Sequence, residues 1–414
     1  MNPHSAESDY RWLVGPEAAK IFAKVSEQFG SERIDALRIS NFLRRDLPPE
    51  RARLIVEQLD LRGRATAKFS HAEQMLFTRI GLEQATDEWV AEYKASRFPS
   101  APIADLCCGI GGDLIQLAQR GPAFAIDRNP IALLLAEANC SVASKGRHAL
   151  QCNCGEVSTG ALKDVQAWHV DPDRRPSGKR TTKVELHEPS PAVISELLTA
   201  CPNAAIKLAP AAEFDEPWWQ DAELEWISRA RECRQLVAWF GSLAKHPSQR
   251  RATALRSAIH RADGSSTEIL SSTISHSFVG KPDVDQDLAT QVKRYIYEPD
   301  PAVLAAKLEG DFARQHDLAA LSFGVAYFTS DEFVAGPLIT CFEVLDAVPY
   351  QTKQLRHWLA ARKIGRLEIK KRGVPIDPET VRHELKIDGD ESATLLLSRI
   401  AGQVTAIIAR RVVA

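Results

Sequence analysis

The chain of 414 residues contains no apolar run approaching the roughly 20 residues that a helix needs to cross a bilayer. Its first residues, Met1 to Glu7, have neither a basic start nor an apolar core, so they do not predict a signal peptide. We therefore expect a cytoplasmic protein without a membrane partner. The composition, 44% hydrophobic and 26% charged, is typical of a soluble globular chain long enough for two to four domains.

Charge of one sign is also missing, because 52 Lys and Arg nearly balance 54 Asp and Glu and leave a formal net charge of −2. No global basic field therefore indicates nucleic acid, and such a partner would need a local patch. The eight cysteines form only two close sets, Cys107-Cys108 and Cys152-x-Cys154, and neither has the spacing of a structural zinc site. We expect buried or cofactor-lining thiols and no metal.

The stretch from Ile103 to Asp113 has the features of a nucleotide-type cofactor site. An apolar run, Ile103 to Leu106, predicts a strand, and apolar residues at helical spacing follow the stretch. Between them stand Gly109, Gly111 and Gly112, which let the backbone take up positive φ and approach a ligand. The helix start adds unpaired N–H groups, so strand, turn and helix together predict a cofactor site.

Acidic and amide residues follow the next predicted strands. Asp127 ends the second strand, 14 residues beyond Asp113, where a βαβ unit should deliver a ribose-binding carboxylate. Asn153 stands near the end of the third strand, and Asp171-Pro172 ends the fourth. Because ligands bind outside the carboxyl ends of parallel strands, we expect these residues to share one pocket. Asn153 could hydrogen-bond an amine there.

The loop after the fourth strand is charged. It continues as Asp173, Arg174 and Arg175, and a further basic run follows at residues 177–183. The two arginines either contact an anionic substrate or belong to a solvated loop with internal ion pairs. Lys207, within the predicted fifth strand, is expected to be structural rather than catalytic.

Helical periodicity dominates residues 1 to about 95, and strands dominate the chain beyond it. The expected helices in this first part are Pro16–Phe29, Ile34–Leu43, Pro49–Leu61, His71–Ile80 and one capped by Thr86. Later strands are expected at Glu225–Ser228, Gln235–Phe240, Arg250–Leu255, Ser272–Phe278, Phe323–Thr329, Leu338–Leu345 and Gly365–Lys370. Helices are expected at Ala302–Leu308, Lys353–Lys363 and Asp377–Leu385, and a terminal hairpin at Ala393–Ser398 and Val404–Arg410. A proline-bearing junction is expected at Tyr295–Pro301.

The tail from Gln351 to Ala414 is basic. It contains 13 Lys and Arg against 7 Asp and Glu, a net charge of +6 in a chain of net −2. Its densest run is Lys370-Lys371-Arg372, after a predicted strand. The asymmetry indicates a polyanion partner such as RNA, with a solvated basic face of a balanced fold as the alternative.

Three motifs resemble those of a known enzyme class. Asp105-x-x-x-Gly109-x-Gly111 followed by Asp127-Arg-Asn-Pro130 resembles motifs I and II of class I S-adenosylmethionine-dependent methyltransferases, with Cys107 in place of the first motif-I glycine. Asp171-Pro172 resembles the start of the Asp/Asn-Pro-Pro-aromatic motif of methyltransferases that act on nitrogen, without its second proline and aromatic.

Nearly the whole chain is similar to bacterial THUMP-like-domain methyltransferases. The motifs that support this are residues 105–113, 171–175, 297–301 and 369–373, in that order. The resemblance implies an α/β protein with a helical N-terminal domain (1–95) and a Rossmann-like methyltransferase domain (96–290). It also implies a ferredoxin-like segment (291–335) and a THUMP-like domain (336–414). True THUMP domains bind RNA, so RNA becomes the leading substrate class.

The resemblance also implies a role for each candidate residue. The residues expected to bind S-adenosyl-L-methionine are Asp105, Cys107, Gly109, Gly111, Gly112, Asp113, Asp127 and Asn153. Asp113 could instead cap its helix. Asp171 and Pro172 would hold the acceptor amine, and the residues expected to bind substrate are Arg174, Arg175, Lys370, Lys371 and Arg372.

The expected activity is methylation of a base nitrogen in RNA. Two alternatives remain: a methyltransferase for a protein or small molecule, and a non-catalytic RNA-binding protein that keeps the fold.

Overall fold

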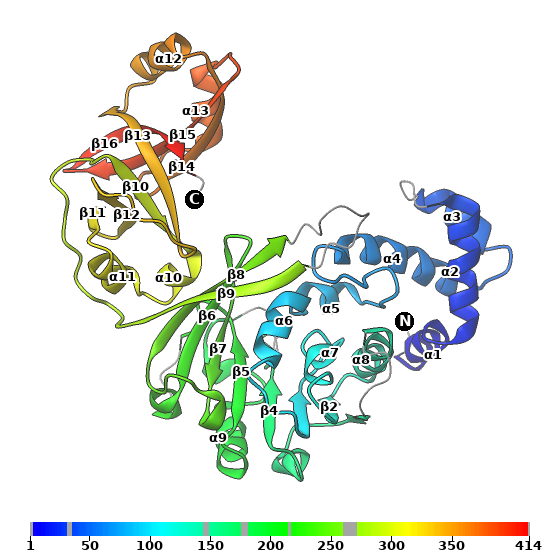
Figure 1. Ribbon diagram of the computed structural model, residues 1–414. Helices are drawn as coiled ribbons and strands as arrows, with labels where there is room; N and C mark the ends of the chain where they lie inside the picture. The colour runs from blue at the N-terminus through cyan, green and yellow to red at the C-terminus, as the bar shows by residue number, and fades with distance from the viewer. Residues whose placement is uncertain are drawn as a thin grey trace, which may run out of the picture. The chain divides into compact units, whose positions relative to one another are not determined.

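The computed structural model describes residues 3–30, 35–143, 149–174, 181–213, 217–259 and 271–412 (Figure 1). The chain divides into two compact units. The N-terminal unit comprises Met1–Ala222 and Leu236–Pro247, and the C-terminal unit comprises Glu223–Gln235 and Ser248–Ala414. Within the described ranges, no helix is long and apolar enough to cross a membrane. The four-domain division expected from the sequence stays a prediction.

Helices form the first part of the N-terminal unit, as the sequence predicts. They are α1 Pro3–Leu13, α2 Pro16–Phe29, α3 Ala36–Leu43, α4 Pro49–Ala65, α5 Arg79–Gln84 and α6 Glu88–Ala95. The bounds of α2 match the prediction because Pro16 stands at its first turn and Gly30, at φ +66°, ends it. The cap of α6 is Asp87, whose side chain accepts from the Val90 backbone N–H, and not Thr86 as expected.

The helix predicted over His71–Ile80 is wrong. Phe77 exchanges two hydrogen bonds with the buried amide of Gln58, and Leu76 exchanges two with the buried amide of Asn139. These side-chain amides satisfy backbone groups that a helix would otherwise pair. The apolar run is therefore buried in an extended conformation, and α5 begins only at Arg79.

A mostly parallel sheet forms the centre of the N-terminal unit (Figure 1). The strands of this sheet that lie in the N-terminal unit are β1 Ile103–Leu106, β2 Ala123–Asp127, β3 Leu150–Cys154, β4 Ala167–Val170, β5 Ala204–Leu208 and, from Leu236 onward, β7 Glu232–Trp239. They lie in the order β3-β2-β1-β4-β5-β7, in which β7 is antiparallel to β5 and the other pairs are parallel. The order reverses between β1 and β4, the point at which open α/β sheets bind ligands.

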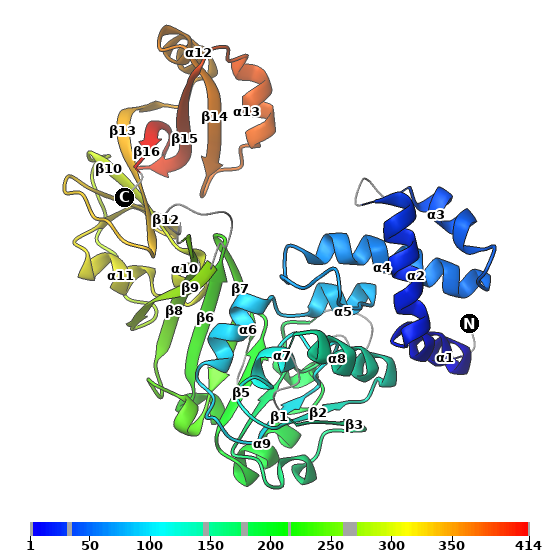
Figure 2. The same ribbon diagram turned by 45° about the vertical axis from the view of Figure 1, so that its right-hand side comes forward.

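Helices flank this sheet. Figure 2 shows α7 Leu114–Leu117 and α8 Pro130–Ala143 beside β1 and β2, and α9 Pro191–Ala200 follows β4 in the chain. Both β1 and β4 are buried at every position, because neighbouring strands and helices cover them. The resulting Rossmann-like α/β architecture confirms the predicted fold class.

The C-terminal unit contains β6 Glu223–Arg229, which pairs in parallel with β8 Arg250–Ile259, and β9 Ser271–Gly280, which pairs antiparallel with β8. Seven further strands form a second sheet in the order β11-β12-β10-β13-β16-β15-β14. Their bounds are β10 Tyr295–Pro299, β11 Ala319–Ser322, β12 Val325–Ser330, β13 Ile339–Pro349, β14 Ile364–Lys371, β15 Glu391–Ile400 and β16 Gln403–Arg411. The helices are α10 Pro301–Ala305, α11 Glu309–Gln315, α12 Thr352–Ala361 and α13 Pro378–Leu385.

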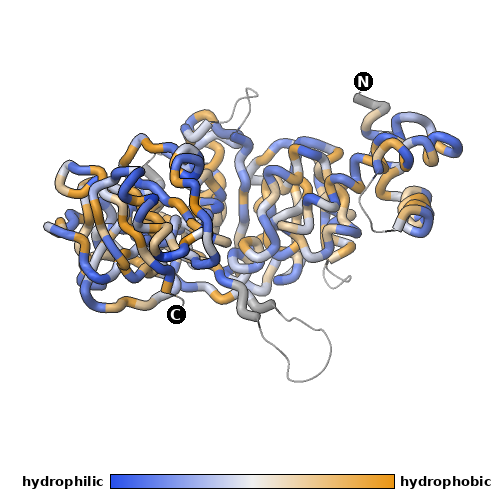
Figure 3. The backbone as a smooth tube through the Cα atoms, turned by 90° about the horizontal axis from the view of Figure 1, so that it is seen from above, coloured by the Kyte–Doolittle hydropathy of each residue, from blue (hydrophilic) through white to orange (hydrophobic). Residues whose placement is uncertain are grey.

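The predicted terminal hairpin is present as β15 and β16. The expected junction at Tyr295–Pro301 is instead the strand β10, which pairs with both β12 and β13. The strand expected from Phe323 begins at Val325, because Phe323 and Gly324 form the turn before it. Apolar residues recur along the strands, and many peripheral turns are polar (Figure 3).

Candidate active site

A cavity of about 1000 Å³ lies at the carboxyl ends of β1, β2 and β4 in the N-terminal unit. Its walls include the glycine turn after β1, Asp127 after β2 and Asp171-Pro172 after β4. The candidate residues that line it are Asp105, Cys107, Gly109, Gly112, Asp113, Asp127, Asp171, Pro172 and Arg174. Its size is within the range that buries a nucleoside-sized ligand.

Asp127 and Gly109 form one end of the site. The Gly109 N–H donates to one carboxylate oxygen of Asp127 at 2.8 Å, and the Asn129 N–H donates to the other at 2.8 Å. Burial raises the pKa of Asp127, and these two backbone donors oppose that rise. Each carboxylate oxygen keeps a second lone pair, so Asp127 can still accept from ribose hydroxyls.

The glycine turn needs its glycines for two different reasons. A Cβ on Gly111, at φ +89°, would lie 3.2 Å from the Ala136 Cα of α8, so Gly111 permits close packing. A Cβ on Gly109, at φ +56°, would meet no heavy atom within 4 Å. Gly109 therefore borders open space in the cavity. Cys107 also takes a positive φ, 58°, a conformation that glycine adopts more readily than other residues.

A buried polar network lies beneath the glycine turn. His169 on β4 is in register with Asp105 on β1, and its Nδ1 lies 2.7 Å from Asp105 Oδ1. Its Nε2 lies 3.2 Å from the Nζ of Lys94, which comes from α6. A lysine ammonium can only donate, so Nε2 accepts and Nδ1–H donates to Asp105. The network thereby fixes the orientation of the Asp105 carboxylate.

Asp113 completes this network. Lys94 Nζ lies 2.5 Å from Asp113 Oδ1, and the Thr86 hydroxyl donates to Asp113 Oδ2 at 2.7 Å. Burial acts to raise the pKa of Asp113, but the Lys94 and Lys207 ammonium groups help to hold it below its usual range. Its side chain makes no capping bond to α7. Asp113 therefore anchors the turn to α6 rather than capping the helix that follows.

Asp171 is held by Lys207 of β5. Lys207 Nζ lies 2.6 Å from Asp171 Oδ2 and also donates to the Gln84 carbonyl at 3.2 Å. Burial acts to lower the pKa of Lys207, but Asp171 and Asp113 hold it above its usual value. Within the described part of the chain, no hydrogen bond to Asp171 Oδ1 is found, and the residue lines the cavity. One oxygen is thus fixed and the other is available to a ligand.

The residues present fit S-adenosylmethionine on two observations. Asp105 Oδ2 is buried and has no hydrogen-bond partner among the described residues, although Asp105 lines the cavity. A ligand ammonium would satisfy that oxygen. The lining also has an acidic excess suited to a sulfonium cation. It contains eight acids, Glu57, Asp105, Asp113, Asp127, Glu156, Asp171, Asp173 and Glu188, against four bases, Arg79, Arg128, Arg174 and Lys207.

The loops after β3 and β4 place some of the predicted site residues outside the cavity. Asn153 is exposed and is not among the lining residues, whereas Glu156, three positions later, lines the cavity. Asp173 pairs with Arg128 at 3.0 Å, so part of the charged loop is tied by an internal ion pair. Arg174 lines the cavity, and Arg175 lies outside the described residues.

The basic run of the C-terminal unit is partly paired. Lys370 and Arg372 contact opposite oxygens of Glu298 at 2.9 and 3.2 Å, and Arg231 contacts Glu298 at 3.1 Å. Burial acts to raise the pKa of Glu298, but Lys370 and the two guanidinium groups hold it below its usual value. Lys371 is exposed. Of the expected run, Lys371 thus presents the most accessible charge.

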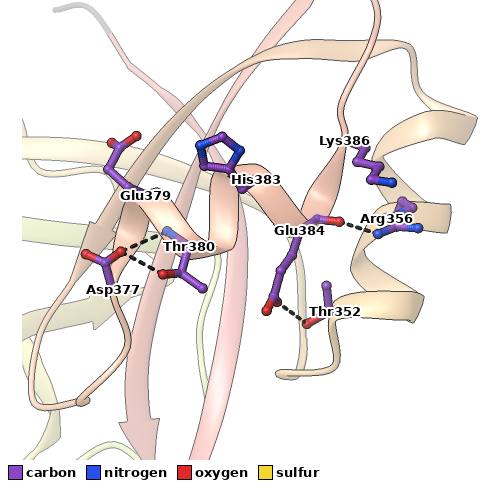
Figure 4. A pocket seen from close by; sticks show the side chains of 8 residues that line it. All are labelled: Thr352, Arg356, Asp377, Glu379, Thr380, His383, Glu384 and Lys386. Carbon is purple, nitrogen blue, oxygen red and sulfur yellow. Dashed lines mark hydrogen bonds between the residues drawn. The ribbon is translucent and has the colours of Figure 1, made fainter.

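A further cavity of about 750 Å³ lies between α12 and α13 (Figure 4). Its polar groups bond mainly to one another: Arg356 donates to the Glu384 carbonyl, Thr352 donates to the Glu384 carboxylate, and Asp377 caps α13 through Thr380. These contacts account for five of the eight lining residues as helix-packing and capping groups, and Glu379 lies 3.7 Å from Arg382.

Sequence reasoning missed Lys94, His169 and Glu156 and assigned Lys207 only a structural part. His169 stands two residues before Asp171 on one strand, and that spacing is a usable signal because alternate strand residues share a face. Lys94 gives no such signal, since it comes from a helix 75 residues away.

Comparisons with known proteins agree with this architecture. Residues 339–411 match the family model described as THUMP domain-like. A protein of Mycobacterium tuberculosis named as an uncharacterized S-adenosylmethionine-dependent methyltransferase is 28% identical over 374 residues, covering 87% of this chain and 98% of its own. The same match is found in a second strain of that organism.

A crystal structure of a candidate methyltransferase from Porphyromonas gingivalis W83 aligns over 100% of both chains, with a TM-score of 0.69 and 18% identity. At that identity the likeness shows a shared fold.

Proposed function

We propose that this chain, an S-adenosylmethionine-dependent methyltransferase with a THUMP-like C-terminal domain, methylates a nitrogen of a base in RNA. The observation that supports an amino acceptor is Asp171 in the cavity, with one oxygen fixed by Lys207 and the other available. A carboxylate oxygen at this position can accept a hydrogen bond from an acceptor N–H.

The cofactor, when bound, supplies an electrophilic methyl group on a sulfonium. The residues proposed to hold it are Asp105, Gly109 and Asp127, with Glu156 accepting from an amine where Asn153 was expected to do so. Cys107, Gly111, Gly112 and Asp113 shape the turn on which they stand. The chain's contribution to the reaction is mainly proximity and orientation.

Asp171 and Pro172 are proposed to align the acceptor nitrogen. Lys207 restrains Asp171 because its ammonium is itself held by the Gln84 carbonyl and is almost fully buried. The carboxylate therefore keeps one orientation without ligand, which lowers the cost of aligning the acceptor. A loose carboxylate in solvent would need to be ordered at each turnover.

RNA is proposed as substrate because of the THUMP-like match and the basic C-terminal tail. The acidic lining of the cavity suits a base and a cationic cofactor but not phosphates. Phosphate binding would therefore fall to individual basic residues, among them Arg174 in the lining and Lys371 in the tail. Protein or small-molecule substrates would not need such residues.

The test is transfer of tritium from methyl-labelled cofactor into total RNA, compared with total protein and small molecules. We expect label in RNA and, after digestion to nucleosides, on a base nitrogen. Asp171→Ala should bind cofactor nearly as the wild type does but lower turnover by roughly 10²-fold, as a lost orienting group does. Label confined to protein or small molecules, or full activity of Asp171→Ala on RNA, would contradict the proposal.

A further inference from the structure

Phe323 is the most exposed large apolar side chain among the residues that the structure describes, at 78%. It stands in the two-residue turn between β11 and β12, followed by Gly324 at φ +67°. Its neighbours on the hairpin are buried, since Leu321 is 2% and Val325 6% exposed. The hairpin is therefore anchored in the core while its tip presents one aromatic ring to solvent.

The basic run lies along the same hairpin. A Cβ on Gly373 would lie 2.7 Å from a Val325 methyl group, so the chain after Arg372 touches the first residue of β12. The Arg372 guanidinium lies 5.3 Å from the ring centre of Tyr327, two positions further along β12. Phe323 is two residues before Val325, so its Cα lies no more than about 7 Å from that of Val325, and the tip of the hairpin is next to the segment that follows Arg372.

The charges around Glu298 leave a surplus of positive charge near the hairpin, because among the described residues Arg231, Lys370, Arg372 and Arg411 face only two carboxylates, Glu298 and Glu368. Glu368 lies 3.9 Å from Lys370 and 3.0 Å from Arg411. Glu298 is one carboxylate, with 7% of its side chain exposed, and it is shared by Arg231, Lys370 and Arg372. These cations keep 24–31% of their side chains exposed, so they still contribute to the surface potential. Lys371 adds a further exposed charge.

We propose that the Phe323 ring stacks on an unpaired base of a single-stranded RNA segment whose phosphates are bound by Lys371 and the cations around Glu298. An aromatic face beside a groove of cations is how proteins bind single strands without reading their sequence, because every base has a stacking face. Paired bases cannot reach the ring, so the surface discriminates single strands from duplex. This proposal rests on RNA being the substrate.

The experiment measures affinity for a mixed-sequence single-stranded RNA and for a matched duplex by filter binding at several salt concentrations. The full chain is compared with Phe323→Ala, Phe323→Trp and Lys371→Ala. Phe323→Ala should weaken single-strand binding roughly 5- to 100-fold, as the loss of one base–aromatic stack does, with an unchanged salt slope. Phe323→Trp should bind as well as the wild type.

Lys371→Ala is the matched control, because it removes charge and leaves the ring. It should lower affinity and flatten the salt slope by up to about one. Cofactor affinity, measured in the same preparations, should stay unchanged in all variants and reports folding. Equal single-strand affinity of the wild type and Phe323→Ala overturns the stacking role alone. A wild type that binds no RNA overturns the RNA proposal on which it rests.

Discussion

At the scale of single residues, the site is built from carboxylates with unequal surroundings. Asp105 and Asp113 are buried among Lys94 and His169, whereas Asp127 and Asp171 each keep acceptor capacity toward the cavity. Burial alone would favour neutral acids, and the neighbouring cations and backbone donors oppose it. Asp113 therefore holds the architecture, Asp105 keeps one unpaired oxygen for a ligand, and Asp127 and Asp171 keep acceptor capacity toward the cavity.

Asp127→Ala should weaken cofactor binding by roughly 1–3 kcal/mol, since a charge-assisted acceptor for ribose hydroxyls is lost. The variant also frees the Gly109 and Asn129 N–H groups, so Asp127→Asn, which keeps one acceptor oxygen and can retain one of these two bonds, is the matched control. Isothermal titration calorimetry measures both. Unchanged affinity of Asp127→Ala would remove this residue from the ribose role.

Lys207→Met should lower kcat by roughly 10-fold or more while leaving cofactor affinity nearly unchanged, because Asp171 loses the ion pair that orients it. Methionine fills a similar buried volume without the charge. Lys207→Arg, which restores a positive charge, should recover part of the activity. No such recovery is expected if Lys207 only fills space. Steady-state kinetics on labelled RNA tests this, and a kcat equal to that of the wild type would show that Asp171 needs no such partner.

At the scale of elements, the glycine turn joins β1 to α7 while packing against α8 and the α5–α6 connection. Gly111 faces Ala136 of α8, and Gly112 lies so close to Thr86 that a Cβ would be 3.0 Å from its backbone nitrogen. Gly109 instead borders the cavity. Within one short turn, Gly111 and Gly112 thus permit close packing, and Gly109 leaves room for a ligand.

Gly111→Ala and Gly109→Ala should separate these two tasks. Gly111→Ala should lower the free energy of unfolding by about 1–3 kcal/mol, because it combines positive φ with a close backbone contact. Gly109→Ala should destabilise less but weaken cofactor binding more, since its methyl group enters the cavity. Thermal unfolding measures the loss of stability of each variant, and calorimetry measures its cofactor affinity. If both variants lose the same stability and the same cofactor affinity, the two glycines do not have separate roles.

At the scale of the whole molecule, distant segments are joined by ion pairs within each unit. Lys94 of α6 reaches Asp113, and Glu298 of β10 gathers cations from β14 and from the turn between β6 and β7. The Glu298 cluster joins segments far apart in sequence through one carboxylate. Its contribution to stability therefore depends on the protonation of that single acid.

Glu298 should make the stability of the C-terminal unit depend on acid pH. Its pKa is depressed in the folded chain, so its stabilisation is present above the unfolded value near 4.3 and is lost as pH falls through the folded pKa. Glu298→Gln should lower the free energy of unfolding at neutral pH by about 1–3 kcal/mol. This is less than the loss expected on breaking a fully buried ion pair, because the cations stay partly hydrated. The variant's free energy of unfolding should also depend less on pH below pH 4.3 than that of the wild type. Denaturant unfolding of both proteins at pH 7 and pH 3.5 measures both effects. If Glu298→Gln loses as much free energy of unfolding at pH 3.5 as at pH 7, Glu298 is not the source of the pH dependence.

The sequence by itself determined the parts of this protein that local chemistry specifies. Strand periodicity and the turn glycines predict β1, β2 and the site between them, and proline and glycine at its ends predict the bounds of α2. The acids at strand ends follow from the rule that parallel strands present their carboxyl ends to one edge. Each of these features is specified by residues close together in sequence, within one element or one strand–turn–helix unit.

Only the tertiary structure decided which distant residues meet. His169 lies 64 residues from Asp105, Lys94 lies 75 from His169, and Glu298 lies 72 from Lys370. The extended segment at Leu76 was unpredictable for the same reason, since Asn139 lies 63 residues away and replaces its helical hydrogen bonds. A periodic pattern reports which face of an element is apolar, but the partner of a buried polar group depends on how elements pack, and that is set by the whole chain.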